Sequence, residues 1–293
     1  MKKGLTLTFV IAAESANYGE GISNISVLKK MSRGDGNQYT YISRQALRYN
    51  MIDQLEWDNT PVEQQGKVTQ FAPGATIKDY PEIDLFGYMK TVTKNKEEKD
   101  DKNNKGSATT RSAVVRLSNA ISLEPYKGDM DFLTNMGLAS RKGLDNTIAQ
   151  SEIHASYYAY TITIDLDLVG IDGAINIENA EKGKRVNKLL ETIKYLYRDI
   201  KGRRENLSPI FVIGGLYERK NPFWENRVKI RKNAIVIETL EELLSDPSVK
   251  ENTHVGILDG ILDNTEKVYE KLNANTVSDV FAVLEKEVNT YYE

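Results

Sequence analysis

The order of its strand and helix patterns constrains the fold of this 293-residue chain more than any other feature of the sequence. Alternating or short apolar runs predict strands in four segments: residues 5–11, 112–118, 154–168 and 209–213. Helical spacing of apolar residues predicts helices over residues 42–54 and 184–196. The resulting order, β-α-β-β-α-β, is that of the ferredoxin-like α+β fold, which many RNA-recognition domains share.

Two long segments interrupt this order. Connections of this length are uncommon in a compact domain and usually have a function of their own. Residues 55–111 include a run of mixed charge without apolar residues, at 94–105, which predicts a mobile loop. Residues 126–151 combine apolar side chains with the basic pair Arg141-Lys142. That second segment is expected to form either a projecting arm or a small packed subdomain.

Three further local expectations concern the loops and the C-terminal third. Residues 14–39 are expected to form a polar loop, and Gly214-Gly215 to stop the fourth strand. Short strands are expected at 234–237 and 255–258. Two threonines each precede an acid by three residues and predict capping boxes: Thr239 with Glu242, and Thr276 with Asp279. The helix after Thr276 is expected to bury Val277, Val280, Phe281, Leu284 and Val288.

Composition excludes several classes of function. The formal net charge of −3 argues against a generally basic nucleic-acid binder, so any nucleic-acid site is expected to be a local basic track. The absence of cysteine removes disulfides and thiol nucleophiles, and is typical of a reducing cytoplasm. The first apolar run is interrupted by threonines and followed by Glu14, which favours a strand over a signal peptide. No apolar run is long enough for a membrane span, so no membrane partner is expected.

The sequence offers little catalytic chemistry. Its two histidines lie a hundred residues apart, and neither an HExxH nor a Walker A motif is present. Asp165 and Asp167 share one face of a predicted strand and could hold magnesium, although such pairs are more often the solvent side of a half-exposed strand. We therefore predict no catalytic residue, no metal site and no cofactor.

Arg44 and Arg48 are the leading candidates for nucleic-acid contact. Their four-residue spacing places them on one helix face, where each guanidinium offers a planar fork to phosphate oxygens. Ser43 and Gln45 add hydrogen-bonding groups beside them. A solvated basic helix face is the alternative reading.

Arg116 interrupts an apolar strand and is therefore expected to face an open sheet surface or a partner, unless it is an ordinary exposed strand arginine. Further candidate cations for a phosphate track are Lys29, Lys30, Arg33, Arg111, Arg203, Arg204, Arg219 and Lys220. Several of these lie in loops or at strand ends, where ligand contacts concentrate. For Arg219-Lys220, at the tip of a glycine-rich turn, a plain hairpin loop is the alternative.

Four motifs, in the same order, resemble those of a known family. They are Gly4-Leu-Thr-Leu-Thr-Phe leading into Glu14-Ser-Ala-Asn-Tyr-Gly19, then Ile42-Ser-Arg-Gln-Ala-Leu-Arg48, Asp84-Leu-Phe-Gly-Tyr-Met89, and Val115-Arg-Leu-Ser-Asn-Ala-Ile-Ser-Leu-Glu-Pro125. The chain thereby resembles the CRISPR-associated DevR-type autoregulator family, the repeated backbone subunit of type I Cascade surveillance complexes, subtype I-B. The resemblance covers most of residues 1–215.

The resemblance implies an RNA-recognition-like palm, with residues 55–111 inserted as a finger and residues 126–151 as a thumb. The palm is expected to comprise residues 1–54, 112–125 and 152–293. Several copies would line up along one CRISPR guide RNA, each thumb reaching over its neighbour and kinking the RNA. The implied partners are this RNA, neighbouring copies and other Cascade subunits, with target DNA bound only through the guide.

The resemblance also implies site residues. Arg44 and Arg48 match the family's basic residues that grip the RNA backbone. Asn17 and Tyr18 in the opening loop, and Arg141 and Lys142 in the thumb, are further expected RNA contacts.

These features predict a non-catalytic RNA-binding scaffold, and two alternatives stay open. Related backbone subunits of type III complexes cut target RNA with a loop aspartate, and Asp35 lies in such a loop here. The surrounding Ser32-Arg-Gly-Asp-Gly-Asn37 is typical of a tight polar turn, in which aspartate bonds to its own backbone. A DNA-binding regulator is the second alternative, although the sequence shows no helix-turn-helix.

Overall fold

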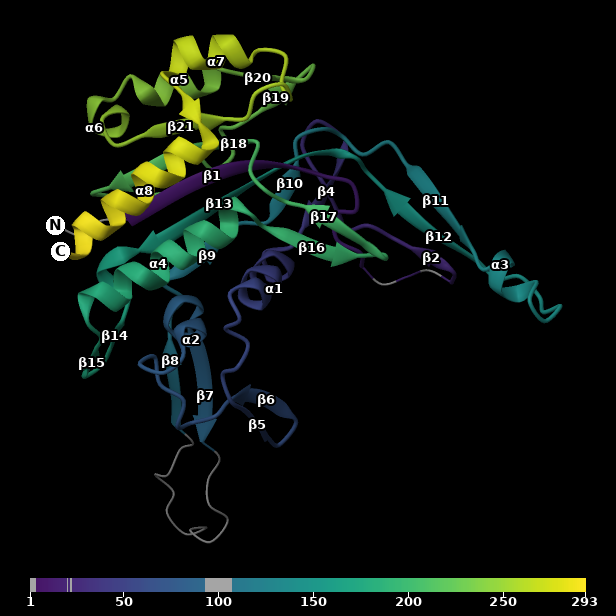
Figure 1. Cartoon of the computed structure of the whole chain (residues 1–293), viewed down its shortest axis with the longest axis horizontal. Helices are drawn as coiled ribbons and strands as arrows, with labels where there is room; N and C mark the ends of the chain where they lie inside the picture. Colours follow the sequence, from purple (N-terminus) through teal and green to yellow (C-terminus); the bar gives the residue numbers. More distant parts are fainter. Residues whose placement is uncertain (1–3, 20, 22, 93–106) are drawn as a thin grey trace, which may run out of the picture.

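The computed structural model describes residues 4–19, 21, 23–92 and 107–293, and Figure 1 shows its architecture. Four strands form the centre of one sheet in the order β18-β1-β13-β9, each antiparallel to its neighbours. They are β1 (Gly4–Ala13), β9 (Val115–Leu117), β13 (Ser156–Asp165) and β18 (Phe211–Tyr217). With α1 (Arg44–Gln54) and α4 (Asn179–Lys194) between them, this is the predicted ferredoxin-like arrangement. The predicted α+β fold is confirmed.

The sheet continues on both sides of this centre to nine strands. One side adds β10 (Ala120–Ser122), β4 (Gln38–Ile42) and β3 (Lys30–Ser32), and the other adds β21 (His254–Ile257) and β22 (Asn275–Thr276). The expected loop over residues 14–39 was therefore wrong in part, because β2 (Ile25–Ser26), β3 and the first residues of β4 lie within it. These strands are short and polar, so no apolar period marks them.

Three helices cover one face of the sheet. α1, α4 and α8 (Val277–Tyr292) pack there against Leu5, Leu7 and Phe9 in one core. Phe9 and Phe281 stack at 6.1 Å between ring centroids. The prediction for α8 is confirmed, since its five apolar positions are buried and Thr276 caps it by accepting a hydrogen bond from the Asp279 N–H.

A second layer, which we call the cover, lies over part of the opposite face and comprises residues 218–253 and 258–272, on either side of β21. Its elements are β19 (Ile230–Arg231), β20 (Ala234–Ile235), α5 (Glu238–Leu244), α6 (Pro247–Lys250) and α7 (Thr265–Leu272). Trp224 is fully buried in the core beneath it. The predicted Thr239 capping box was wrong, because the Thr239 hydroxyl bonds instead to the carbonyl oxygens of Arg227 and Val236, both at 2.8 Å.

Gly214 and Gly215 do not stop the fourth strand, contrary to expectation, since β18 runs through both. A Cβ atom on Gly214 would lie 2.0 Å from the Thr6 carbonyl oxygen, and one on Gly215 would lie 1.9 Å from that of Asn252. Gly214 also has a φ of 147°. The two glycines therefore permit close approach of neighbouring backbone within the sheet.

Two groups of inserted elements project from the sheet (Figure 1). The finger comprises β5 (Val62–Gln65), β6 (Val68–Phe71), α2 (Pro81–Phe86), β7 (Tyr88–Val92) and β8 (Ser107–Arg111). The arm comprises β11 (Asp129–Thr134), α3 (Met136–Ala139) and β12 (Ile148–Ile153), and it falls within or beside the predicted thumb. The charge run at residues 94–105, expected as a mobile loop, lies outside the described residues.

The remaining elements are short. β13 ends earlier than predicted and leads into the 3₁₀ turn η1 (Leu166–Leu168), which is followed by the hairpin of β14 (Ile171–Asp172) and β15 (Ile175–Asn176). A second hairpin, β16 (Tyr197–Ile200) and β17 (Arg203–Asn206), follows α4. In the part of the chain that the structure describes, no helix is both long enough and apolar enough to span a membrane.

Candidate nucleic-acid interface

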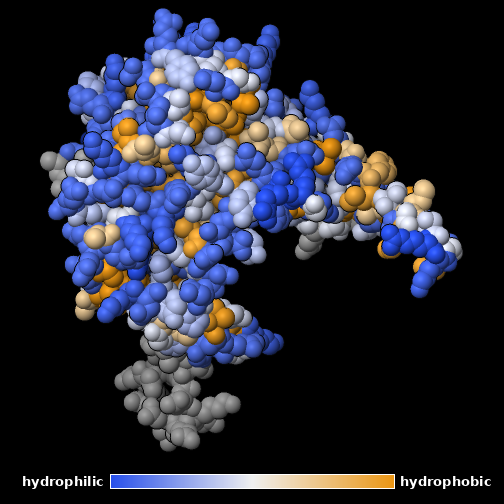
Figure 2. Space-filling view, viewed as in Figure 1, coloured by the Kyte–Doolittle hydropathy of each residue, from blue (hydrophilic) through white to orange (hydrophobic). Residues whose placement is uncertain are grey.

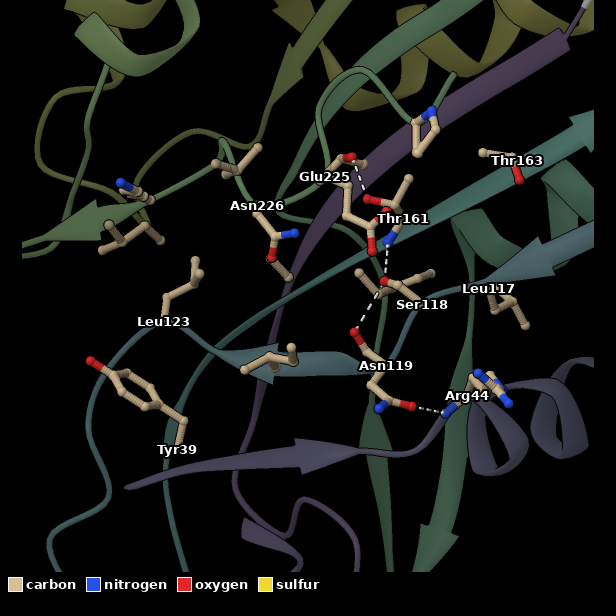
Figure 3. Close-up of a pocket in the computed structure, with 18 of the residues that line it drawn as sticks. Tyr39, Arg44, Leu117, Ser118, Asn119, Leu123, Thr161, Thr163, Glu225 and Asn226 are labelled. Atoms are coloured by element: carbon tan, nitrogen blue, oxygen red, sulfur yellow. Dashed lines mark hydrogen bonds between the residues drawn. The ribbon is translucent and has the colours of Figure 1, made fainter. Parts of the chain in front are cut away.

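A groove of about 920 Å³ lies on the sheet face opposite the helices, where the cover leaves β9, β10 and β13 open (Figure 3). Thr8, Thr161 and Thr163 contribute to its lining from the sheet, and Glu225 and Asn226 contribute from the cover. Its basic lining residues are Arg33, Arg44, Arg116, Lys220, Lys229 and Arg231. Its acidic lining residues are Asp35, Asp165 and Glu225. A chain of net negative charge thus concentrates positive charge in one groove, where a polyanion would be attracted.

A chain of hydrogen bonds fixes one wall of the groove, as Figure 3 shows. The Thr161 N–H donates to the Ser118 hydroxyl at 2.9 Å, and that hydroxyl donates to the Asn119 carbonyl oxygen at 3.1 Å. The Asn119 side-chain oxygen then accepts from the Arg44 N–H at 2.9 Å. The first turn of α1 is therefore tied to β13, and Arg44 is held at the groove.

Arg44 and Arg48 do not share one environment, although their spacing predicted that they would act together. Arg44 is exposed and lines the groove. Arg48 lies 3.2 Å from the Glu82 carboxylate and its guanidinium stands 5.1 Å from the Phe86 ring centre. Gln45 and Arg48 line a separate pocket of about 390 Å³ beside the finger. The finger covers the second turn of α1, which sequence spacing on one helix does not reveal.

Ser43, Asn17 and Tyr18 make structural contacts instead of lining the groove. Ser43 is buried and caps α1, because its hydroxyl accepts from the Ala46 N–H at 3.3 Å. The Asn17 side-chain oxygen accepts from the Ser43 N–H at 3.2 Å. The Tyr18 hydroxyl donates to the Glu152 carbonyl oxygen at 3.0 Å. These contacts join the loop after β1 to α1 and to the base of the arm.

Arg111 is a buried structural residue. Its guanidinium lies 2.7 Å from the Asp84 carboxylate, and the Arg111 side chain is 7% exposed. It also contacts the backbone carbonyl oxygens of Leu168 and Ile171. A side chain held in this way is not free to bind a phosphate from solvent.

Arg116 faces the open sheet surface, as its position in the strand predicted. It is half exposed and donates to the Asp165 carboxylate at 2.7 Å. Lys220 lies 3.7 Å from the same carboxylate and also contacts Asp167. Asp165 and Asp167, considered for magnesium, thus have cationic side chains as neighbours. No cluster of three or more histidine, aspartate or glutamate residues that could hold a metal is found among the described residues.

Asp35 lies at the rim of the groove, in the turn between β3 and β4. One carboxylate oxygen accepts from the Asn37 N–H at 3.0 Å, as expected for a turn aspartate, and the other accepts from the Tyr39 hydroxyl at 2.5 Å. The bond from Tyr39, followed by that from Asn37, lowers the pKa of Asp35. The same bond to Asp35 raises the pKa of Tyr39. Arg33 stands 4.7 Å from the Tyr39 ring centre.

The other predicted basic residues lie outside the groove. Arg141 and Lys142 are exposed just after α3, at the tip of the arm, and Arg219 is exposed in the turn after β18. Lys229 and Arg231 also line the groove but were not predicted from the sequence, nor were the polar groove residues Ser118, Asn119, Thr161 and Thr163. The sequence did contain a signal for Thr161 and Thr163, because their strand alternates threonine with isoleucine and so places the threonines on one face of the sheet.

Comparison with known proteins gives consistent results. The family described as "CRISPR-associated negative auto-regulator DevR/Csa2" matches residues 5–233. The "CRISPR-associated protein Cas7/Cst2/DevR" of Myxococcus xanthus (strain DK1622) is 28% identical over an alignment of 168 residues, and the match covers 52% of this chain and 53% of that protein. The match therefore spans about half of each protein.

Two solved structures share the fold. A chain of a "CRISPR RNA-guided surveillance complex, pre-nicking" aligns with a TM-score of 0.61 at 10% identity, covering 97% of this chain and 100% of that one. A chain of a "CRISPR RNA-guided surveillance complex" aligns with a TM-score of 0.58 at 12% identity, covering 98% and 99%. At such low identity the likeness is one of fold.

Proposed function

The chain belongs to the CRISPR-associated DevR/Csa2 family, and we propose that it is a non-catalytic scaffold that polymerises along CRISPR guide RNA. It forms, in this proposal, the backbone of a Cascade-type surveillance complex and acts in antiviral defence in the cytoplasm. The other subunits of that complex are its protein partners, and target DNA is bound through the guide. The groove on the open sheet face is the observation that carries the proposal.

The composition of the groove favours contact with phosphate and sugar. Six basic side chains line it, together with hydroxyl and amide groups of Ser118, Asn119 and Thr163. Such groups position a nucleic-acid backbone without reading its sequence. In an RNA-guided complex base pairing carries the sequence information, so the protein needs only backbone and shape contacts.

The arm supports the proposed assembly of several copies. Large apolar side chains are exposed along it, each by 36% to 66%: Met130, Phe132, Leu133, Met136, Leu138, Leu144 and Ile148. Figure 2 shows hydrophobic surface on the arm. Contiguous exposed apolar surface marks an interaction site in a soluble protein. A neighbouring copy on the same RNA is the partner we propose for it.

One observation favours the endoribonuclease alternative: Asp35 lines the groove. Two features favour the non-catalytic reading. Both carboxylate oxygens already accept hydrogen bonds, and a lowered pKa makes Asp35 a weak base. The DNA-binding alternative has less support, since the described residues contain no helix-turn-helix.

The proposal is tested by binding the purified chain to labelled single-stranded RNAs of several sequences and lengths. We expect similar affinities for all sequences, a steep loss of affinity with added salt, and more bound copies on longer RNA. Native mass spectrometry counts the copies. A strong preference for one short sequence at constant salt would contradict the proposal, as would an absence of binding.

A further inference from the structure

The six groove cations fall into two groups. Arg33, Arg44, Lys229 and Arg231 form no ion pair with any residue in the described part of the chain. Arg116 and Lys220 are paired with carboxylates. Four cations of the groove are therefore available to phosphate, whereas the other two already have a counter-charge.

Asp165, the last residue of β13, is the carboxylate that the two paired cations share. Its side chain is 9% exposed, whereas that of Arg116 is 49% exposed. Thr163 is opposite Arg116 in the register of β13 and β9, so Asp165 is the diagonal neighbour of Arg116 on the same sheet face. The carboxylate lies below the guanidinium and is little screened by water, which strengthens its attraction for the two cations.

Backbone contacts hold Arg116 and Lys220 in place independently of this carboxylate. β9 carries Arg116 in register with β13. The segment carrying Lys220 crosses β1 closely, since a Cβ atom on Gly4 would lie 3.1 Å from the Lys220 Cα atom. The Thr6 hydroxyl also donates to the Asn221 carbonyl oxygen at 3.2 Å. The ion pairs are thus not required to bring the two cations to the groove.

We propose that Asp165 is an internal competitor of RNA phosphate, which limits the affinity of the groove by neutralising Arg116 and, together with Asp167, Lys220. This inference rests on the proposed RNA binding and assigns a regulating role to a residue of the same groove. A phosphate approaching Arg116 or Lys220 competes with a fixed carboxylate, so these two cations contribute little net attraction. The four unpaired cations supply most of the binding, and each copy holds RNA weakly enough to adjust its position along it.

The test is Asp165→Asn, which removes the charge and keeps the shape of the side chain. Affinity for a labelled oligouridine too short to hold two copies is measured by fluorescence anisotropy at low and moderate salt. We expect Asp165→Asn to bind about threefold to tenfold more tightly at low salt. Its salt dependence should also steepen by about 0.7 in log–log slope for each phosphate newly neutralised on a single strand. Thermal melting checks that the variant is folded.

Two further variants test whether Asp165 acts through Arg116 and Lys220. Glu241→Gln makes the same charge change on exposed α5, outside the groove, and should leave the affinity nearly unchanged. In a variant that already carries Arg116→Gln and Lys220→Gln, adding Asp165→Asn should raise the RNA affinity no more than Glu241→Gln does. Weaker RNA binding by Asp165→Asn would show that Asp165 positions the cations and would overturn the inference. A gain in RNA affinity from Asp165→Asn that persists after Arg116 and Lys220 are replaced would also overturn it. If the unmodified chain binds no RNA, the proposed function fails and the inference fails with it.

Discussion

The Asp84 carboxylate lies 2.7 Å from the Arg111 guanidinium and is fully buried between the finger and the sheet. The same carboxylate lies 2.9 Å from the Arg185 guanidinium and accepts from the Gly170 N–H at 2.9 Å. Asp84 belongs to α2, Arg111 to β8 and Arg185 to α4. One buried carboxylate therefore joins the finger to α4 through Arg185, and it is the carboxylate partner of the buried Arg111. Arg185 has a second carboxylate partner, because it also lies 3.0 Å from Glu181.

We predict that Asp84→Asn lowers the free energy of unfolding by about 3–5 kcal/mol, because it leaves the buried Arg111 without its carboxylate partner and removes one of the two carboxylate partners of Arg185. Urea unfolding followed by circular dichroism measures this loss. Asp58→Asn is the matched control, since Asp58 is exposed on the segment that leads to the finger. Equal unfolding midpoints for the two variants would contradict a structural role for the Asp84 network.

The two arginines of α1 are predicted to behave differently. Arg44→Ala removes a groove cation and should lower RNA affinity about tenfold, within the range of one charge-assisted contact. Arg48→Ala removes the contact with Glu82 and should leave RNA affinity within about twofold, since exposed ion pairs contribute little. Anisotropy with a short labelled RNA measures both. An equal loss in the two variants would show that Arg48 leaves Glu82 to bind RNA.

The arm is predicted to matter for assembly and not for folding. Phe132 and Leu138 are each 63% exposed, so Phe132→Asp with Leu138→Asp should leave the melting temperature unchanged. Binding of one copy to a short RNA should also be unchanged, whereas assembly of several copies on a long RNA should be lost. Val62→Asp is the control, because Val62 is 61% exposed on the finger. Normal assembly by the arm variant would exclude these side chains from the interface between copies.

His154 is predicted to make stability depend on pH. Its ring is buried near the base of the arm, where the Nδ1 atom lies 2.7 Å from the Thr40 hydroxyl oxygen. Burial lowers the pKa of His154 below 6.5, although Glu124 and Asp129 partly oppose the shift. Between the lowered folded pKa and 6.5 the unfolded chain binds more protons than the folded chain, so stability rises with pH.

The free energy of unfolding should therefore be higher at about pH 7.5 than at about pH 5.5. Urea unfolding at both pH values measures the difference, and His154→Gln should reduce it. His254→Gln is the control, because it replaces the other histidine of the chain, which lies 2.9 Å from Glu287 near the surface. A pH dependence that follows His254 would contradict the assignment.

The ferredoxin-like centre of the sheet could be predicted from the sequence, because the order of its strands and helices follows from local hydrophobic periodicity. Strands and helices of the ferredoxin-like centre each carry their own pattern, and Arg116 was expected on an open sheet face because it breaks an apolar run. The second wall of the groove could not be predicted in this way. Lys229 and Arg231 reach the sheet only because the cover folds back over it, which is a long-range contact without a local signal.

Two other misreadings have the same physical origin. Arg111 looked like a free cation, because its partner Asp84 lies on another element and the burial of both is a tertiary property. Gly214-Gly215 looked like a strand end, although the pair serves close approach to Thr6 and Asn252. In each case a segment distant in the sequence determines the role of the residue, and the local sequence does not reveal that segment.

Asp35 decides between the scaffold and the nuclease. Its turn is held by the bonds from Asn37 and Tyr39, and neither histidine lines the groove. We predict that the assembled complex with magnesium leaves a complementary labelled RNA intact. Asp35→Ala should change neither assembly on guide RNA nor interference against DNA, because an exposed turn aspartate contributes mainly to its own loop.

Denaturing gels of the labelled RNA test the first expectation, and plasmid interference tests the second. Tyr39→Phe is the matched control, since it removes the same hydrogen bond and keeps the carboxylate. Regularly spaced cuts in the complementary RNA, lost in Asp35→Ala and kept in Tyr39→Phe, would overturn the non-catalytic assignment. The carboxylate at the groove rim would then be the reacting group, and the chain would act as an endoribonuclease on RNA paired to its guide.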